Sequence, residues 1–485
     1  MLKPLNTPWD YAKAAHLLNR AGFGGTPSEI EALQKAGMEG AVEQLLSAPA
    51  DQAQFPPPDW AKPQNLVAMA EEAAMMADEQ TRKQFRQERQ KEDRNRFESL
   101  VTWWIQRMRH TPNPLQEKMT LFWHGHFATS SQKVRETYYM WLQNETLRRN
   151  ALRNFGNMVK EISRDPAMLI WLDTNDSLCF KPNENFGREL MELFTLGIGN
   201  YTEQDVQQAA RAFTGYKINP ANQAFRYAPL QHDDGEKTFL GQVGKFTGDD
   251  VIDIILEQRA CSQFMARKLW TFFAYENPSQ ATVDALAETF RKNKYEIRPT
   301  MKTLLTSAEF YSDRAMRTQI KSPVQWLVGT AKLLEVNTPP EKPMLNALRQ
   351  LGQVPFMPPN VKGWDGGKAW ISTSTLLQRY NLASYAVGNG AMHIQPFRMN
   401  GKPAEKPGRD VAPVEYPDFA KLVPQETRKD PKTVVENLTL RLFQSPLTPR
   451  DTEPFHQFLK DKPVNEHTLA QLVQLMMSTP QYQLA

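Results

Sequence analysis

Two histidines stand one residue apart in the stretch FWHGHF, at His124 and His126. Imidazole nitrogens are common ligands of zinc and other divalent transition metals. Within a continuous helix, however, side chains two residues apart point in directions about 200° apart. The two histidines could therefore share an ion only if the helix stopped at Gly125, a residue type suited to ending a helix. Taken alone, this spacing favours a structural corner over a pair of metal ligands.

A carboxylate that could complete such a site lies in NENFGRELMELFTLG, residues 183–197, which the apolar spacing predicts to be one capped helix. Glu189 falls at the flank of the apolar face, where it could bind a metal or act as a general acid or base. Half exposure without a role is an equally good interpretation of Glu189. For Glu192 a surface pair with Arg188 is the favoured interpretation, and Arg188 is also a candidate substrate contact.

A third imidazole lies in the polar stretch HDDGEKTFLG, residues 232–241, which predicts a turn. His232 could bind the same metal, and Asp233 could orient a ligating imidazole. Asp233 and Lys237, together with Glu189, are the candidate catalytic residues, because loops often carry catalytic side chains. A turn closed by an aspartate side chain, with incidental charges around it, explains the pattern equally well.

The stretch PPNVKGWDGGKAWIST, residues 358–373, is a proline- and glycine-rich loop that carries Trp364 and Trp370. Exposed tryptophans stack on sugars and other rings, so this loop could line a ligand cleft. Two large aromatic side chains could equally pin the loop to the core.

Helices must position most of these candidates, because helical periodicity dominates the chain and strands do not alternate with helices. Two short β-prone runs near 215–230 predict one hairpin, so the predicted fold class is all-α with one small hairpin. The chain divides into six segments: N-terminal helices 1–47, a proline-rich connector 48–63, a long charged helical arm 64–110, a helical core 111–390 with the candidate site, an irregular linker 391–431, and C-terminal helices 432–485 that pack on the core.

Composition excludes several classes of protein. The 58 basic and 54 acidic residues nearly balance, which does not indicate a nucleic-acid-binding surface. Two cysteines cannot form a disulfide framework, and no apolar run is long enough to span a membrane. No basic segment followed by an apolar one opens the sequence. The chain as it stands is therefore expected in the cytoplasm, or in the periplasm if an export leader has been removed.

Four blocks, FWHGHF, NENFGRELMELFTLG, HDDGEKTFLG and PPNVKGWDGG, together resemble a large bacterial family, domain of unknown function 1800. The resemblance runs from about residue 10 to 390 or beyond. It implies a mostly helical fold, a sulfatase-like partner protein encoded nearby and, in many members, a twin-arginine export leader, which this sequence does not show. The family offers no established catalytic residues.

Three functions remain open. The first, which the sequence favours, is a metal-dependent hydrolase or oxidoreductase in which four side chains bind zinc, iron or manganese: His124, His126, His232 and Glu189. The second is a non-catalytic helical scaffold or a partner of the sulfatase-like protein. The third is a glycan-active or glycan-binding protein that uses the carboxylates Glu189 and Asp233 with the two tryptophans. The substrate, a small molecule or a glycan, is not identified by the sequence.

Overall fold

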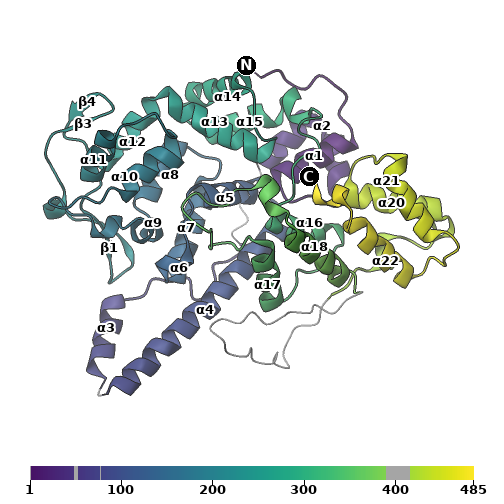
Figure 1. The fold of residues 1–485 in the computed structure, drawn as a ribbon, viewed down its shortest axis with the longest axis horizontal. Helices are drawn as coiled ribbons and strands as arrows, with labels where there is room; N and C mark the ends of the chain where they lie inside the picture. Colours follow the sequence, from purple (N-terminus) through teal and green to yellow (C-terminus); the bar gives the residue numbers. More distant parts are fainter. Residues whose placement is uncertain (1, 48–52, 77, 389–414) are drawn as a thin grey trace.

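The computed structural model describes residues 2–47, 53–76, 78–388 and 415–485. Helices make up most of this part, and the strands in it form two small antiparallel hairpins (Figure 1). The predicted all-α class is confirmed. None of the helices in the described ranges is both long enough and apolar enough to cross a membrane.

The N-terminal pair consists of α1 (Tyr11–Ala21) and α2 (Pro27–Leu46). Thr26 and Glu29 form a capping box at the start of α2, in which each side chain accepts a hydrogen bond from the other residue's backbone. Gly37 kinks α2 with a φ of 72°, a backbone conformation that glycine adopts without a steric cost.

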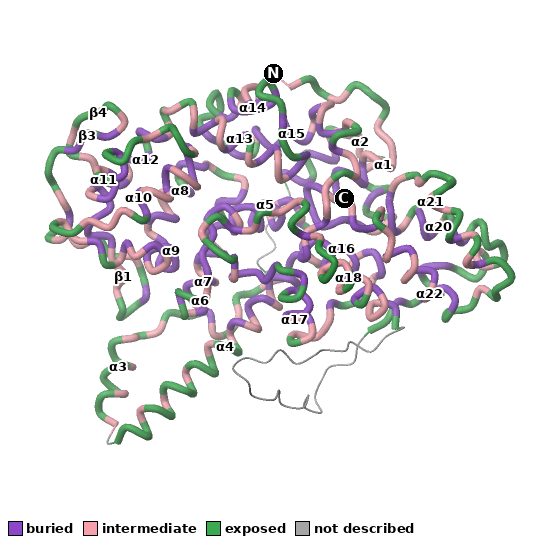
Figure 2. Tube along the Cα trace, in the orientation of Figure 1, coloured by how far each residue is buried: buried purple, intermediate pink, exposed green. Residues whose placement is uncertain are grey.

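A long arm projects from the body of the molecule (Figure 1). It consists of α3 (Leu66–Met75) and α4 (Glu79–His110), and α3 has no buried residue. In α4 the buried residues begin only at Phe97, so its first half is solvated along its length (Figure 2). Within α4, Arg96 lies 3.5 Å from Glu92.

Helix α5 (Pro114–His126) runs through the middle of the molecule, and ten of its 13 residues are buried (Figure 2). Two polar residues, Glu117 and Lys118, are among the buried ones. The helices around it are α6 (Ser131–Val134), α7 (Thr137–Asn150), α8 (Phe155–Ser163), α9 (Pro166–Trp171), α10 (Asn185–Glu189), α11 (Glu203–Ala212), α12 (Gly248–Glu257), α13 (Arg259–Phe273), α14 (Gln280–Lys292) and α15 (Ile297–Leu305).

The segment predicted to be one helix at 183–197 changes its winding halfway. Helix α10 passes into the π-helix η2 (Leu190–Thr195), and Gly197 ends it with a φ of 79°. The amides of Leu196 and Gly197 both bond to the carbonyl of Met191. The carbonyls of Leu193 and Phe194 lie in the last turn, where they need partners from elsewhere in the fold.

The predicted hairpin is present, with β1 (Tyr216–Asn219) paired to β2 (Ala224–Tyr227). A second hairpin, β3 (Lys237–Phe239) and β4 (Gln242–Gly244), lies where the sequence predicted only a polar loop. Its two turn residues, Leu240 and Gly241, both have positive φ, as a tight two-residue hairpin turn requires. Strands of three residues are too short to give a clear alternating pattern in the sequence.

The last helices are α16 (Pro323–Leu333), α17 (Glu341–Leu351), α18 (Thr373–Ala386), α19 (Phe419–Leu422), α20 (Pro431–Phe443), α21 (Pro449–Leu459) and α22 (Glu466–Met477). Helices α20–α22 share an apolar cluster with α16 and α18 that includes Trp326, Leu382 and Leu438. Most of the predicted irregular linker lies outside the described residues, and its remaining part contains α19.

Candidate functional site

Helix α5 does not end at Gly125 but continues through His126 to a C-cap at Phe127, whose amide bonds to the carbonyl of Trp123. The two histidines therefore leave the helix in different directions, and the condition for a shared ion is not met. Each imidazole has found a separate partner.

His124 holds the loop that carries the tryptophans. Its Nε2 accepts a hydrogen bond of 2.8 Å from the amide of Phe356, and its ring contacts those of Trp104 and Trp364. Phe356 has a φ of 66°, unusual for a bulky residue, so its position depends on such bonds. Burial lowers the pKa of His124 to about 3, which keeps this imidazole neutral.

His126 joins two other elements. Its Nε2 lies 3.0 Å from the carbonyl oxygen of Phe194 in η2, so this nitrogen must carry the proton. Its Nδ1 then accepts a hydrogen bond of 3.1 Å from the Nζ of Lys268 on α13, and that Nζ also reaches the carbonyl of Leu193 at 3.3 Å. Burial, followed by the charge of Lys268, holds the pKa of His126 well below its usual value.

The backbone of Gly125, between the two histidines, packs against the tryptophan loop at Gly363. A side-chain carbon at Gly363 would lie 2.3 Å from the carbonyl oxygen of Gly125, and Gly363 has a φ of 82°. Only glycine allows so close an approach in that conformation. Three consecutive residues of α5 thus contact three parts of one site. His124 binds the backbone just before the tryptophan loop, Gly125 contacts the loop itself, and His126 binds the α13–η2 junction.

These elements enclose a cavity of about 370 Å³. Its walls come from α5, from α13 and the residues after it, from the segment that leads into α16, and from the tryptophan loop. The side chains that give it chemical character are Lys118, His126, Arg267, Lys268, Glu276, Gln325, Gln353, Lys362, Trp364, Asp365 and Trp370. Both tryptophans named from the sequence are therefore in the wall, Trp370 buried and Trp364 half-buried.

Lys118 is the residue of this wall that the sequence did not reveal. Its side chain is 3% exposed, and its Nζ lies 5.3 Å from the ring centre of Phe23 and 5.5 Å from that of Phe272. Among the described residues, no hydrogen bond or ion pair is formed by that Nζ. Burial, reinforced by the charge of Arg20, lowers the pKa of Lys118 to about 7.

A neighbouring groove shares three cationic residues with the cavity, Arg267, Lys268 and Lys362. Burial lowers the pKa of Lys268 to about 8. The acidic residues Glu276 and Asp365 are exposed, and so are the cations Arg267 and Lys362. Of the cationic side chains in the wall, Lys118 is buried and Lys268 is half-buried.

Glu189 and Arg188 lie outside this cavity. Glu189 is half-buried, and burial together with Glu192 raises its pKa. Arg188 does not pair with Glu192: it bonds to Glu203 at 2.8 Å and to Glu184 at 3.2 Å, and Tyr201 donates to Glu192 instead. Arg188 thus ties α10 to α11, which is a structural role.

The HDDGEKTFLG block lies beside the hairpins at one end of the molecule, away from α5 (Figure 1). His232 Nδ1 lies 3.0 Å from the carbonyl of Thr214, and Lys237 donates to the carbonyls of Asp233 and Gly235. Asp233 forms a two-point ion pair with Arg211, with distances of 2.7 and 3.0 Å. Asp233 also accepts a hydrogen bond of 2.9 Å from the amide of Gly235, which closes a turn within the block.

No group of three or more histidine, cysteine, aspartate or glutamate side chains in the described ranges could hold a metal ion. The four residues predicted to be ligands are thus not brought together, because each imidazole bonds to a different part of the backbone. The predicted donors do not fit a zinc, iron or manganese site.

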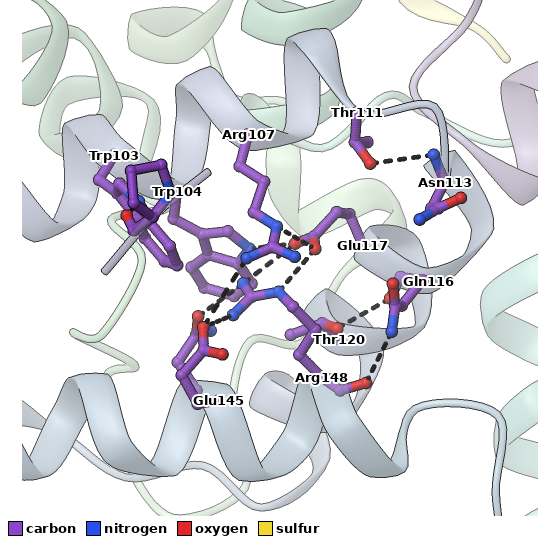
Figure 3. Close-up of polar contacts among 12 residues, drawn as sticks. Trp103, Trp104, Arg107, Thr111, Asn113, Gln116, Glu117, Thr120, Glu145 and Arg148 are labelled. Carbon is purple, nitrogen blue, oxygen red and sulfur yellow. Dashed lines mark hydrogen bonds and ion pairs between the residues drawn. The ribbon is translucent and has the colours of Figure 1, made fainter. Parts of the chain in front are cut away.

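A second buried polar group surrounds Glu117, the residue before Lys118 on α5 (Figure 3). Arg107 and Arg148 contact its carboxylate at 3.0 and 2.6 Å, and the indole of Trp104 donates to it at 2.8 Å. Both arginines also reach Glu145. Two buried cations thus face two carboxylates, and this network ties α4, α5 and α7 together.

The fold and the site define a mostly helical protein with a central cavity walled by cations and tryptophans. The chain belongs to the family described as Protein of unknown function (DUF1800), whose model matches residues 16–484. The resemblance seen in the sequence blocks is therefore confirmed. Neither a curated protein nor a solved structure is found to match the chain.

Proposed function

We propose that the protein binds a small anionic ligand with a ring or other planar group in the cavity between α5, α13 and the tryptophan loop. The observation that carries this proposal is the buried ammonium of Lys118, which faces the cavity and has no carboxylate partner in the part of the chain that the structure describes. A buried unpaired charge destabilises the fold. An anion in the cavity would supply the missing partner, with Arg267 and Lys268 nearby to add to the attraction.

The tryptophans support a ligand with a flat face. Trp364 is half-buried in the wall, and an indole offers a large rigid surface for stacking. A sugar that carries an acidic group would satisfy both the cations and the indole, which keeps the glycan-binding hypothesis. Hydrolysis by Glu189 and Asp233 is not part of this proposal, since neither carboxylate lines the cavity.

Three phosphate esters would test the proposal against their neutral parents by calorimetry: glucose 6-phosphate, phenyl phosphate and pyridoxine 5′-phosphate. We expect at least one ester to bind tenfold or more tightly than its parent and to quench tryptophan fluorescence. The Lys118→Met variant should lose most of that preference, whereas the Arg188→Ala variant should keep it. Equal binding of esters and parents, or a preference that survives in Lys118→Met, would exclude the proposal.

A second candidate function, docking of a partner protein, rests on the arm. Helix α3 has no buried residue, and it exposes the apolar side chains Val67 and Met75. The sulfatase-like protein that the family resemblance implies is the partner to test, by sedimentation of the mixed proteins. Association lost in a Val67→Glu/Met75→Glu variant would support docking. Absence of association in the unaltered chain would remove this candidate.

A further inference from the structure

We propose that Lys118 is an amine nucleophile that forms a Schiff base with an aldehyde or ketone group of the ligand. The inference rests on the proposed function, because it requires the cavity to receive a ligand. It adds the class of that ligand, an anionic carbonyl compound, and a covalent step.

The position of Lys118 differs from that of the other buried lysines. Lys321 donates to the carbonyl of Tyr482 at 2.8 Å, and Lys237 donates to two backbone carbonyls. Both therefore have the acceptors that a structural lysine needs. Lys118 is equally buried, yet its Nζ faces two aromatic rings and the cavity. A lysine held in this way is placed to react rather than to tie elements together.

The surroundings of Lys118 favour the neutral amine, which is the nucleophilic form. Its pKa of about 7, the result of burial and of Arg20, leaves a large fraction of the amine unprotonated at neutral pH. An exposed lysine is almost wholly protonated there. The charged and titratable groups around the cavity are Arg20 on α1, His126 on α5, Arg267, Lys268 and Glu276 on and after α13, and Lys362 and Asp365 on the loop.

Two amides that line the cavity with Lys118 can orient a carbonyl group. Gln353 uses its Oε1 to accept from the amide of Val324 at 3.0 Å, which leaves its Nε2 as a donor. Gln325 uses its Nε2 to donate to the carbonyl of Asn19 at 3.0 Å, which leaves its Oε1 as an acceptor. Both residues line the cavity. The Gln353 donor would polarise the carbonyl oxygen, while the Gln325 oxygen would accept a hydrogen bond from the amine.

The reaction balances without an oxidant or a metal. The lone pair of the Lys118 amine forms a bond to the carbonyl carbon, and the π electrons move to the oxygen, which is protonated to give a carbinolamine. The carbon–oxygen bond then breaks and a carbon–nitrogen double bond forms. The carbonyl oxygen leaves as water with the two protons that the amine gives up.

Pyridoxal 5′-phosphate, an anionic ring aldehyde, is the probe for this reaction, and borohydride reduction followed by peptide mass spectrometry locates the adduct. We expect Lys118 to be labelled at least tenfold faster than the exposed Lys91 at pH 7.5. Its labelling rate should level off above about pH 7, whereas that of Lys91 should rise further up to about pH 10. The adduct at this site should be absent in Lys118→Met, with thermal unfolding used to confirm that the variant is folded.

Pyridoxine 5′-phosphate, which has an alcohol in place of the aldehyde, separates the two proposals. If it binds and protects Lys118 from labelling, both stand. If it binds while Lys118 in the unaltered chain stays unlabelled, the Schiff base is excluded and anion binding stands. If Lys118 is labelled without protection by the phosphate ester, the amine is reactive but the anion proposal fails at this ligand. If neither compound binds, both proposals are overturned.

Discussion

Two neighbouring residues on α5, Glu117 and Lys118, carry buried charges in opposite circumstances. The carboxylate of Glu117 has two arginines and an indole around it, and a second carboxylate balances the arginines (Figure 3). The ammonium of Lys118 lies over two aromatic rings and faces the cavity, and the charged group near it is an arginine. Since consecutive residues of a helix point about 100° apart, one helix can carry a balanced network on one side and an unbalanced charge on the other.

This difference between Glu117 and Lys118 indicates a structural role for the first and a ligand-binding role for the second. A balanced network needs nothing further, so its removal should affect stability alone. An unbalanced buried charge lowers stability, and that of Lys118 lies in the wall of a cavity where a ligand could balance it. The following experiments test that distinction, from the largest expected effect to the smallest.

Replacing Glu117 with glutamine should cause the largest loss of stability. The change leaves Arg107 and Arg148 buried beside a neutral amide, and breaking a buried ion pair in this way costs about 3–5 kcal/mol. Urea unfolding of the variant and the unaltered chain would measure the difference. A loss below about 1 kcal/mol, as for an exposed pair, would mean that the network is solvated and would weaken the comparison.

Replacing Lys118 with methionine should stabilise the fold at pH 6 by about 1–4 kcal/mol, the range seen when buried ionic groups are exchanged for apolar ones. The pKa of Lys118 is about 7 in the folded protein and near 10.5 in the unfolded chain. Stability of the unaltered protein should therefore rise with pH between about 7 and 10.5, and the advantage of the variant should shrink over that window. Unfolding curves at pH 6, 8 and 10 would check this. A destabilised variant at pH 6 would contradict an unpaired ammonium.

The buried carboxyl group of Asp165 allows the same kind of pH test, but here stability should change with pH in the opposite direction. Burial raises its pKa from 3.8 to about 7, so the folded state holds a proton that the unfolded chain releases. Stability should then fall as the pH rises from about 4 to 7. Asparagine would keep the helix cap to the amide of Met168. Asp165→Asn should gain on the unaltered protein by up to about 1.4 kcal/mol for each pH unit of that window. Parallel pH profiles of the two proteins would show that Asp165 stays charged.

Removing Arg188 should have the smallest effect. Its partners Glu184 and Glu203 are partly exposed, and such pairs contribute about 0–1 kcal/mol. Arg188→Ala should therefore unfold within about 1 kcal/mol of the unaltered chain and bind phosphate esters equally well. A tenfold loss of ester binding would restore the sequence-based interpretation of Arg188 as a substrate contact.

The fold class followed from helical spacing, and the long charged arm from its mixed charges, because both are local properties of the chain. The candidate site followed only in part. Three of the segments singled out in the sequence do contact one another: FWHGHF, η2 and the tryptophan loop. His126 bonds to Phe194, and Gly363 packs against Gly125. The sequence could not say that they meet through packing and backbone hydrogen bonds, because a histidine that binds a carbonyl looks the same as one that binds a metal.

Lys118 was missed for a physical reason. Within NPLQEKMTLFWHGHF the pair Glu117–Lys118 reads as the solvated side of an amphipathic helix. Only the surrounding helices show that α5 is buried on nearly all sides, and that depends on contacts far apart in the chain. Phe23, for example, precedes Lys118 by about a hundred residues, and Phe272 follows it by about a hundred and fifty. Local patterns carry no record of such neighbours.

The attachment of the tryptophan loop to α5 also has an entropic consequence. His124 holds the amide of Phe356, and Gly363 rests on Gly125, so the loop is fixed at two points on one helical turn. Ordering a free backbone costs roughly 1–2 kcal/mol per residue. Here the loop is already ordered when the chain folds. The binding of a ligand that stacks on Trp364 is therefore not weakened by the entropy of ordering the loop. The stretch FWHGHF would thus raise ligand affinity by keeping the loop around Trp364 in its binding conformation, without supplying a metal ligand.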